Sequence, residues 1–194
     1  MRKLYLVVSA IIIVLSGCAS PAGINQMTAK TIEMSKISGD SSLKNNLAIK
    51  NICESAKSFF GNRELTTPLI KSGDYRQALE RSLSSATLLA ADQANAAYML
   101  EVNLMDVKFL PNHDNDALVS ITFDYEFLVT AEYTLVEKMT GKKVYSKTIS
   151  TTFIATPSDS IFSYKRVEIA AEGAARANIE KVVDELLSLH ILST

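Results

Sequence analysis

The sequence predicts a two-layer α+β domain in which an antiparallel sheet carries two helices on one face. From Val119 to Leu135, nine successive odd positions hold apolar or aromatic residues, which is typical of a strand with one buried face. Segments with a helical period lie on either side of the strand region, at about residues 73–90 and 162–190. The resulting order, β-α-β-β-β-α, differs from the regular alternation of parallel-sheet proteins.

The N-terminus resembles a bacterial lipoprotein signal peptide. Arg2 and Lys3 precede an uncharged apolar run of twelve residues, from residue 4 to residue 15. This run is too short to cross a bilayer, because a membrane-spanning helix needs about 20 residues. Ser16 and Gly17 then lead directly to Cys18, which is the lipobox pattern. The resemblance implies that residues 1–17 are removed and that Cys18 becomes the lipidated first residue.

Lipidation at Cys18 would determine where the protein resides. Each buried methylene of an acyl chain contributes about 0.8 kcal/mol, and two or more chains anchor a protein stably. Ala19, and not Asp, follows Cys18. By the sorting rule of enteric bacteria, this resemblance implies the inner leaflet of the outer membrane. We therefore expect a lipid-anchored domain on the periplasmic side.

Composition excludes several classes of protein. Removal of residues 1–17 from the 194-residue chain would leave 177 residues, with 18 basic and 21 acidic side chains. This balance gives no basic surface for nucleic acid, and the length suits one domain. Cys53 would be the remaining cysteine, so no disulfide can form within the processed chain. We expect Cys53 to be a small, buried, hydrophobic residue on a strand. The alternative is that its thiol is reactive or pairs with a cysteine of another chain.

Residues 18–44 are predicted to hold the lipidated cysteine and a flexible tether, and residues 45–194 the periplasmic domain. The tether is rich in Ser, Thr, Lys, Asn and Ala and carries Pro21, Gly23 and Gly39. A flexible chain of about 25 residues spans roughly 25–30 Å. A short amphipathic turn or two is expected around four apolar residues: Ile24, Met27, Met34 and Ile37.

The domain is predicted to begin with a strand over residues 47–53. Residues 54–72 should form a loop, because Gly61, Asn62 and Pro68 interrupt any regular pattern. A helix follows from about residue 73 to residue 90, with one apolar stripe: Tyr75, Leu79, Leu83 and Ala86. Asp74 followed by Gln77 resembles a capping box, and Ser72 is a competing N-cap.

Two long strands and a hairpin partner should follow. In residues 97–110 the apolar positions change from even to odd after Leu104, and a shift of one residue predicts a β-bulge. The seventeen residues from Val119 to Leu135 would extend about 56 Å at about 3.3 Å each, so this strand should bend or carry a bulge. A turn over residues 137–143, with Gly141 at a positive φ, leads to a strand over residues 144–155. Residues 156–160 end the sheet.

The closing helix is predicted over residues 162–190. Its segment 170–177 consists mostly of small side chains, which predicts a close approach to the sheet. Its later apolar face comprises Ile179, Val182, Val183, Leu186 and Leu189. Four polar residues of this helix are candidates for a functional or structural patch: Arg166, Glu172, Arg176 and Asn178. They are interpreted either as a structural network that ties the helix to a loop, or as a patch that docks a partner or a lipid headgroup. Glu172 and Arg176 are spaced for an i,i+4 pair.

Three segments resemble a group of small Gram-negative lipoproteins without an established function. They are residues 74–79, residues 98–100 and the segment Ala170-Ala171-Glu172-Gly173-Ala174-Ala175-Arg176-Ala177-Asn178-Ile179. The resemblance covers roughly residues 70–188, and some members carry the label UDP-N-acetylglucosamine acyltransferase. The strand order is also similar to that of the lipoprotein in the lipopolysaccharide translocon and of the auxiliary lipoproteins of lipid-transport ABC systems. It is similar as well to the N-terminal domain of the Tol translocation protein. This second similarity concerns the fold and does not carry function.

The sequence offers little for catalysis. The two histidines, His113 and His190, lie in no recognisable motif, although a hydrolytic triad would need one of them as its base. Residues 113–116 (His-Asp-Asn-Asp) are the one cluster of metal-ligand types, and a solvated hairpin turn explains them better than a metal site. The chain has no phosphate-binding loop and no paired-cysteine motif. We predict no catalytic residue, metal or cofactor.

These observations favour a non-enzymatic adaptor or accessory subunit that binds another envelope protein. The alternative is a lipid- or glycan-binding lipoprotein of envelope transport, which would use a groove between the sheet and the helices. An acyltransferase is the least favoured function. Acyltransferases of that label are left-handed β-helices built from hexapeptide repeats, and this chain has no six-residue period.

Overall fold

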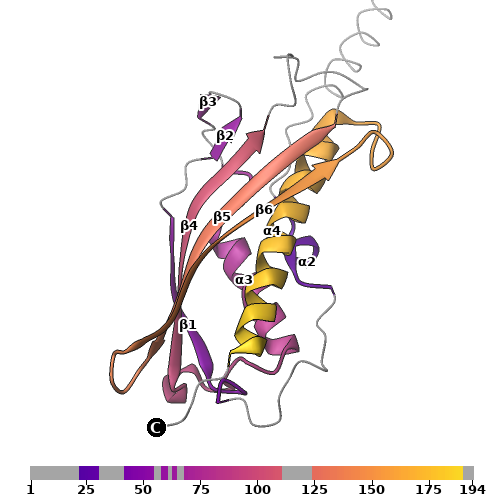
Figure 1. Cartoon of the computed structure of the whole chain (residues 1–194). Helices are drawn as coiled ribbons and strands as arrows, with labels where there is room; N and C mark the ends of the chain where they lie inside the picture. The colour runs from indigo at the N-terminus through magenta and orange to yellow at the C-terminus, as the bar shows by residue number, and fades with distance from the viewer. Residues whose placement is uncertain are drawn as a thin grey trace, which may run out of the picture.

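A computed structural model describes residues 22–30, 42–54, 58–60, 63–64, 68–110 and 124–189. The described elements form a curved sheet with two longer helices against one face (Figure 1). In chain order they are α2 (Ile24–Met27), β1 (Leu47–Glu54), β2 (Ser58–Phe60), β3 (Arg63–Glu64), α3 (Ser72–Ser85), the 3-10 turn η2 (Gln93–Asn95), β4 (Tyr98–Leu110), β5 (Tyr125–Glu137), β6 (Lys143–Ala155) and α4 (Ser163–Ser188). The predictions for Cys18, His113 and His190 lie outside the described residues.

The sheet confirms the α+β class and the two layers, but it is mixed. Its strand order is β3-β2-β4-β5-β6, and β1 also pairs with β4. The β4–β5 and β5–β6 pairs are antiparallel, whereas β1 and β2 run parallel to β4. The antiparallel sheet of the prediction is therefore corrected at this edge. The reason is that α3 connects β1 to β4 as a crossover, which returns the chain to the sheet in the same direction.

The alternation in β5 is confirmed over its described part. Six residues face the helices and are at most 3% exposed: Tyr125, Phe127, Val129, Ala131, Tyr133 and Leu135. Residues 119–123 of the predicted strand lie outside the described residues. The three long strands, β4, β5 and β6, are strongly bent along their length (Figure 1). A bend was predicted for β5 from the length of its apolar pattern.

The phase change in β4 is confirmed as a bulge. The pairing of β4 with β5 shifts register between Leu104 and Asp106. Met105 is the extra residue and is 42% exposed, whereas Leu104 and Val107 are both 1% exposed. The bulge thus returns the apolar residues on both sides of it to the core face.

Three local predictions around the helices need correction. The segment 54–72 is not all loop, because it contains β2 and β3. Helix α3 ends at Ser85 and not near residue 90, because the Leu88 carbonyl accepts a hydrogen bond from Leu47 N–H, and Ala90 N–H donates to the Leu47 carbonyl. The N-cap of α3 is Lys71, without a side-chain hydrogen bond, so neither Asp74 nor Ser72 caps this helix.

The small residues of α4 let it lie directly on the sheet, as predicted. Ala170, Ala171, Ala174 and Ala175 are each 0% exposed. A Cβ atom added at Gly173 would lie under 3.0 Å from three ring atoms of Phe153 in β6. At such distances even one methyl group would force the Phe153 ring or the helix to shift. At the other end of β6, Gly141 has a φ of 69°, as the turn requires.

We expect Gly173→Ala to lower the free energy of unfolding by about 1–3 kcal/mol, because the new methyl group overpacks the contact with Phe153. Gly73→Ala is the matched control, since a Cβ at Gly73 in α3 meets nothing within 4 Å. That control should be neutral or stabilising by up to about 1 kcal/mol, as expected for Gly→Ala in a helix. Urea denaturation of both variants measures the difference. Equal effects at the two glycines would contradict the close contact.

Candidate functional site

The four polar candidates of α4 do not form one exposed patch. Arg166 and Asn178 are 0% exposed and Glu172 is 6% exposed, while Arg176 is partly exposed. Arg166 donates from Nη1 to the Ser160 carbonyl at 2.6 Å, and its guanidinium lies 5.1 Å from the centre of the Tyr125 ring. It therefore ties the turn before α4 to the start of β5. This geometry fits the structural-network interpretation of Arg166.

Asn178 is the centre of a buried polar cluster that the sequence pattern did not reveal. Its Oδ1 accepts hydrogen bonds from the hydroxyls of Tyr75 in α3 and Tyr133 in β5, at 3.1 and 2.6 Å. The two hydroxyls lie 2.5 Å apart. Its Nδ2 donates to the carbonyls of Val129 and Ile149, at 3.2 and 2.9 Å. One side chain thus joins α3, α4, β5 and β6.

This cluster is built for stability and not for chemistry with a ligand. Burial raises the pKa of Tyr75 and of Tyr133 well above the ordinary value for tyrosine, so both hydroxyls stay protonated. Both side chains are 0% exposed, as is Asn178, so no substrate can reach them without unfolding. In the sequence the two tyrosines occupy positions of apolar patterns, so they were predicted as core residues. A buried tyrosine hydroxyl usually needs a hydrogen-bond partner, and this was the one signal for a polar residue beside them.

Residues 22–30 pack onto the domain, which corrects the expected free tether over this stretch. Gly23 N–H donates to Glu172 Oε1 at 2.8 Å, and Lys30 N–H donates to Glu180 Oε1 at 3.0 Å. Between them, the Gln26 carbonyl accepts from Arg176 Nη1 at 3.1 Å. Met27 of α2 is 0% exposed and belongs to the core. Glu172 and Arg176 therefore hold the N-terminal segment. Of the predicted amphipathic residues, Met27 enters the core and Ile24 packs against it, while Met34 and Ile37 lie outside the described residues.

The carboxyl group of Glu172 is in an environment that disfavours its charge. Burial raises its pKa above the ordinary 4.5, even though the Gly23 N–H bond acts in the opposite direction. Gly23 donates through a backbone N–H, so a neutral oxygen at the same position can also accept this bond, although more weakly than the carboxylate. The contact between Glu172 and the N-terminal segment therefore does not require ionisation.

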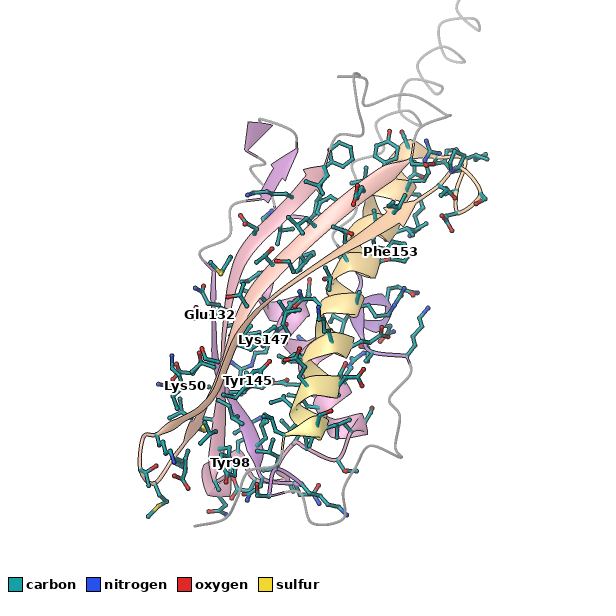
Figure 2. The ribbon with its side chains drawn as sticks, in the orientation of Figure 1. Lys50, Tyr98, Glu132, Tyr145, Lys147 and Phe153 are labelled. Carbon is teal, nitrogen blue, oxygen red and sulfur yellow. The ribbon has the colours of Figure 1, made fainter. Side chains whose placement is uncertain are left out.

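Glu185 makes a second connection between α4 and the sheet. Its carboxylate accepts from Tyr145 at 2.7 Å and from Lys147 at 2.6 Å, and both donors lie on β6 (Figure 2). Burial opposes ionisation of Glu185, but the bonds from Lys147 and Tyr145 outweigh it and lower its pKa. Burial and the bond to Glu185 raise the pKa of Tyr145. The pair holds β6 against the later half of α4.

A shallow open groove of about 620 Å³ lies between α2 and α3. Seven residues line it: Asn25, Thr28, Glu80, Arg81, Ser84, Ser85 and Leu89. Arg81 donates to Asn25 Oδ1 across it. The groove is on the outside of the helix layer, and not between the sheet and the helices where a lipid groove was anticipated.

The sheet face away from the helices is polar and open. Thr130 and Ser150 are hydrogen-bonded at 2.9 Å across β5 and β6, as are Thr134 and Ser146 at 3.2 Å. The face also carries the ion pair between Lys50 and Glu101, at 2.8 Å. Alternate residues of β6 point to this side and are exposed: Ser146, Thr148, Ser150, Thr152 and Ile154. Figure 2 shows Glu132 and Lys50 on the same side of the molecule.

The described residues contain no group of three or more His, Cys, Asp or Glu side chains that could hold a metal ion. His113 and His190 lie outside them, and the side chain of Cys53 is likewise not described. In the same part of the chain, no helix is both long enough and apolar enough to cross a membrane.

No protein family model matches this chain, and no curated protein does. Among solved structures, a candidate lipoprotein from Caulobacter crescentus is 16% identical, with 78% of this chain and 94% of that chain covered and a TM-score of 0.49. A DUF330-family protein from Xanthomonas campestris is 12% identical, with 73% and 83% covered and a TM-score of 0.54. PelC from Paraburkholderia phytofirmans, a dodecamer, is 16% identical, with 74% and 89% covered and a TM-score of 0.44. At these identities the Xanthomonas protein shows a shared fold alone.

Asn178→Ala should lower the free energy of unfolding by roughly 3–5 kcal/mol, because two strand carbonyls lose a donor and the hydroxyls of Tyr75 and Tyr133 keep only each other as partners in the core. Tyr133→Phe removes one hydroxyl and leaves the Asn178 amide bonded to both carbonyls, so a loss of about 1–2 kcal/mol is expected. Chemical denaturation of both variants tests this order. Similar losses in the two would show that Asn178 is not the centre of the cluster.

Glu172→Gln should stabilise the protein at pH 8, because it keeps an acceptor for Gly23 and removes a charge that burial disfavours. The pKa of Glu172 in the folded protein is raised above 4.5, so the wild-type carboxylate is protonated as the pH falls. The difference in stability between wild type and Glu172→Gln should therefore become smaller towards pH 5. Melting curves at both pH values measure the difference.

Glu172→Ala should speed hydrogen exchange of the Gly23 amide, because the N–H loses its acceptor. Unchanged exchange would contradict the contact between Glu172 and Gly23.

Proposed function

We propose that this chain is a lipid-anchored envelope lipoprotein that acts without catalysis, by binding another envelope protein. In this proposal Cys18 carries the acyl chains, and the domain lies on the periplasmic side of the outer membrane, as Ala19 implies. Support for the anchor comes from the lipobox, residues 15–18. Support for a protein partner comes from the edge of the sheet.

The observation that carries this proposal is an unprotected edge strand. Among the strands that the structure describes, β6 is the last in the sheet order, and it is 13 residues long. Its part from Thr148 to Ala155, here called the edge segment, contains no charged residue, proline or glycine. Its pairing with β5 shows no register shift over this length. Proteins usually protect long edges with charges, prolines or bulges, since a bare edge pairs readily with another strand.

An added strand is a common way for one protein to bind another. A partner strand on β6 would use the outward N–H and C=O groups of the edge segment for affinity and the exposed Thr and Ser side chains for specificity. Lys143 and Lys147 lie at the other end of β6 and protect that end. The binding surface is therefore expected to be the edge segment and not the whole strand.

The packing between the layers supports binding by contact over the carriage of lipid. Side chains from both layers meet there and are 0% exposed: Phe127, Ala131, Ala174, Ile179 and Leu186. An acyl chain could enter only by displacing them, at a cost of about 1.5–3 kcal/mol for each large side chain exposed.

A glycan-binding role is the second candidate, and the groove between α2 and α3 is what favours it. The side chains that line the groove include hydroxyl, amide and guanidinium groups, which can hydrogen-bond a saccharide, beside the apolar surface on which a sugar ring can pack. Native mass spectrometry of the purified protein tests this role. A bound saccharide that is lost in Arg81→Ala would support it over the adaptor.

Two lysines in the edge segment, Thr148→Lys with Thr152→Lys, should abolish partner binding without loss of the fold. Both residues are exposed, and position 148 lies opposite Glu132, which a lysine can pair with. Cross-linking and affinity purification from solubilised membranes should recover a stoichiometric partner with wild type and not with this variant. Ser84→Lys with Ser85→Lys adds the same charge on α3 and should retain the partner. Absence of a partner with wild type across growth conditions would refute the adaptor.

A further inference from the structure

The turn that leads into α4 exposes three large apolar side chains. Ile161, Phe162 and Tyr164 are 68%, 55% and 41% exposed. The rings of Phe162 and Tyr164 lie 5.7 Å apart, so the two form one surface. These three residues are here called the apolar tip. A contiguous exposed apolar surface of this kind usually marks a contact with a protein or a membrane.

Residues 23–30 run alongside α4, and their N-terminal end is the end nearer to the tip. Their hydrogen bonds with α4 follow the same order along both segments. Gly23 is bonded to Glu172, Gln26 to Arg176 and Lys30 to Glu180. The segment from Gly23 to Lys30 therefore runs parallel to α4, with its N-terminal end nearest the N-terminus of that helix. Figure 1 shows α2 beside α4, and the turn before α4 at the upper end of the molecule.

The chain length allows Cys18 to reach the level of the tip. Cys18 precedes Gly23 by five residues, which span at most about 18 Å. From Glu172 to Phe162 the helix rises by ten residues, or about 15 Å. Because residues 22–30 are fixed to the domain, a lipidated Cys18 would hold the domain against the bilayer and not on a long tether.

We propose that the apolar tip is a membrane contact: Ile161, Phe162 and Tyr164 enter the headgroup region of the bilayer to which Cys18 is anchored. This inference rests on the proposed lipidation of Cys18. Aromatic side chains with a polar end, such as Tyr164, favour the membrane–water interface. Asp159 is exposed two residues before the tip, and its hydrogen bonds to Thr156 lower its pKa and keep it charged. Its charge limits the tip to a shallow insertion of about 5–10 Å.

Single tryptophans test the contact, since the chain contains none of its own. The lipidated full-length protein would carry either F162W or M139W and be reconstituted into phosphatidylethanolamine/phosphatidylglycerol vesicles, with and without brominated acyl chains. Met139 is the matched control, because it is 90% exposed and lies in the turn at the opposite end of β5 and β6. We expect a blue-shifted emission for F162W and a quenching by brominated lipid roughly twofold or more above that of M139W.

Different results would refute the lipid anchor and the membrane contact of the apolar tip. Mass spectrometry first establishes whether Cys18 is acylated, and vesicle flotation establishes whether the protein is held. Protein without acyl chains that does not float would refute the anchor itself. Protein that floats with equal quenching at positions 162 and 139 would overturn the tip contact and leave the anchor intact. A blue shift of F162W without quenching would show that a second copy or a partner covers the tip, which also overturns it.

Discussion

The position of α4 on the sheet is the constraint on which the rest of the structure depends. Small side chains bring the helix so close that Gly173 has no room for a Cβ beside Phe153. Asn178 then fixes the helix along its axis, because its amide uses both donors on strand carbonyls and its oxygen accepts two hydroxyls. A shift of α4 by one residue would leave these groups unsatisfied in the core, where each costs about 1–3 kcal/mol. Glu172 receives Gly23 only when the helix is in this position.

Local patterns predicted the fold where neighbouring residues determine it. The bulge at Met105 and the positive φ of Gly141 both follow from a few adjacent residues, so the sequence was sufficient for them. The direction of β1 depends on the path of a crossover that carries no local signal, and the prediction failed there. Met27 was predicted in a short amphipathic turn, but the polar residues around it gave no sign that this turn packs into the core of the domain. The Asn178 cluster was missed because its two tyrosines satisfy an apolar pattern and a polar requirement at once.

The packed N-terminal segment changes what a lipid anchor would do. A free tether of about 25 residues would let the domain sample many orientations at roughly 25–30 Å from the membrane. With residues 22–30 held by Glu172, Arg176 and Glu180, only a few residues would separate Cys18 from the folded domain. One covalent anchor and one apolar contact at the same end would restrict tilt as well as distance. The proposed anchor would then orient the domain, and the three α4 side chains that hold the segment would take part in that function.

Orientation in turn constrains the partner. The edge segment ends at Ala155, and five turn residues lead from it to the apolar tip. With the tip at the bilayer, the unprotected part of β6 would lie nearest the membrane, and the lysines at positions 143 and 147 would face the periplasm. Charge is thus present where the edge would meet soluble proteins and absent where it would meet proteins held at the same membrane. This distribution favours a partner that is itself membrane-bound, because such a partner presents its strand at the right height and its local concentration is already high.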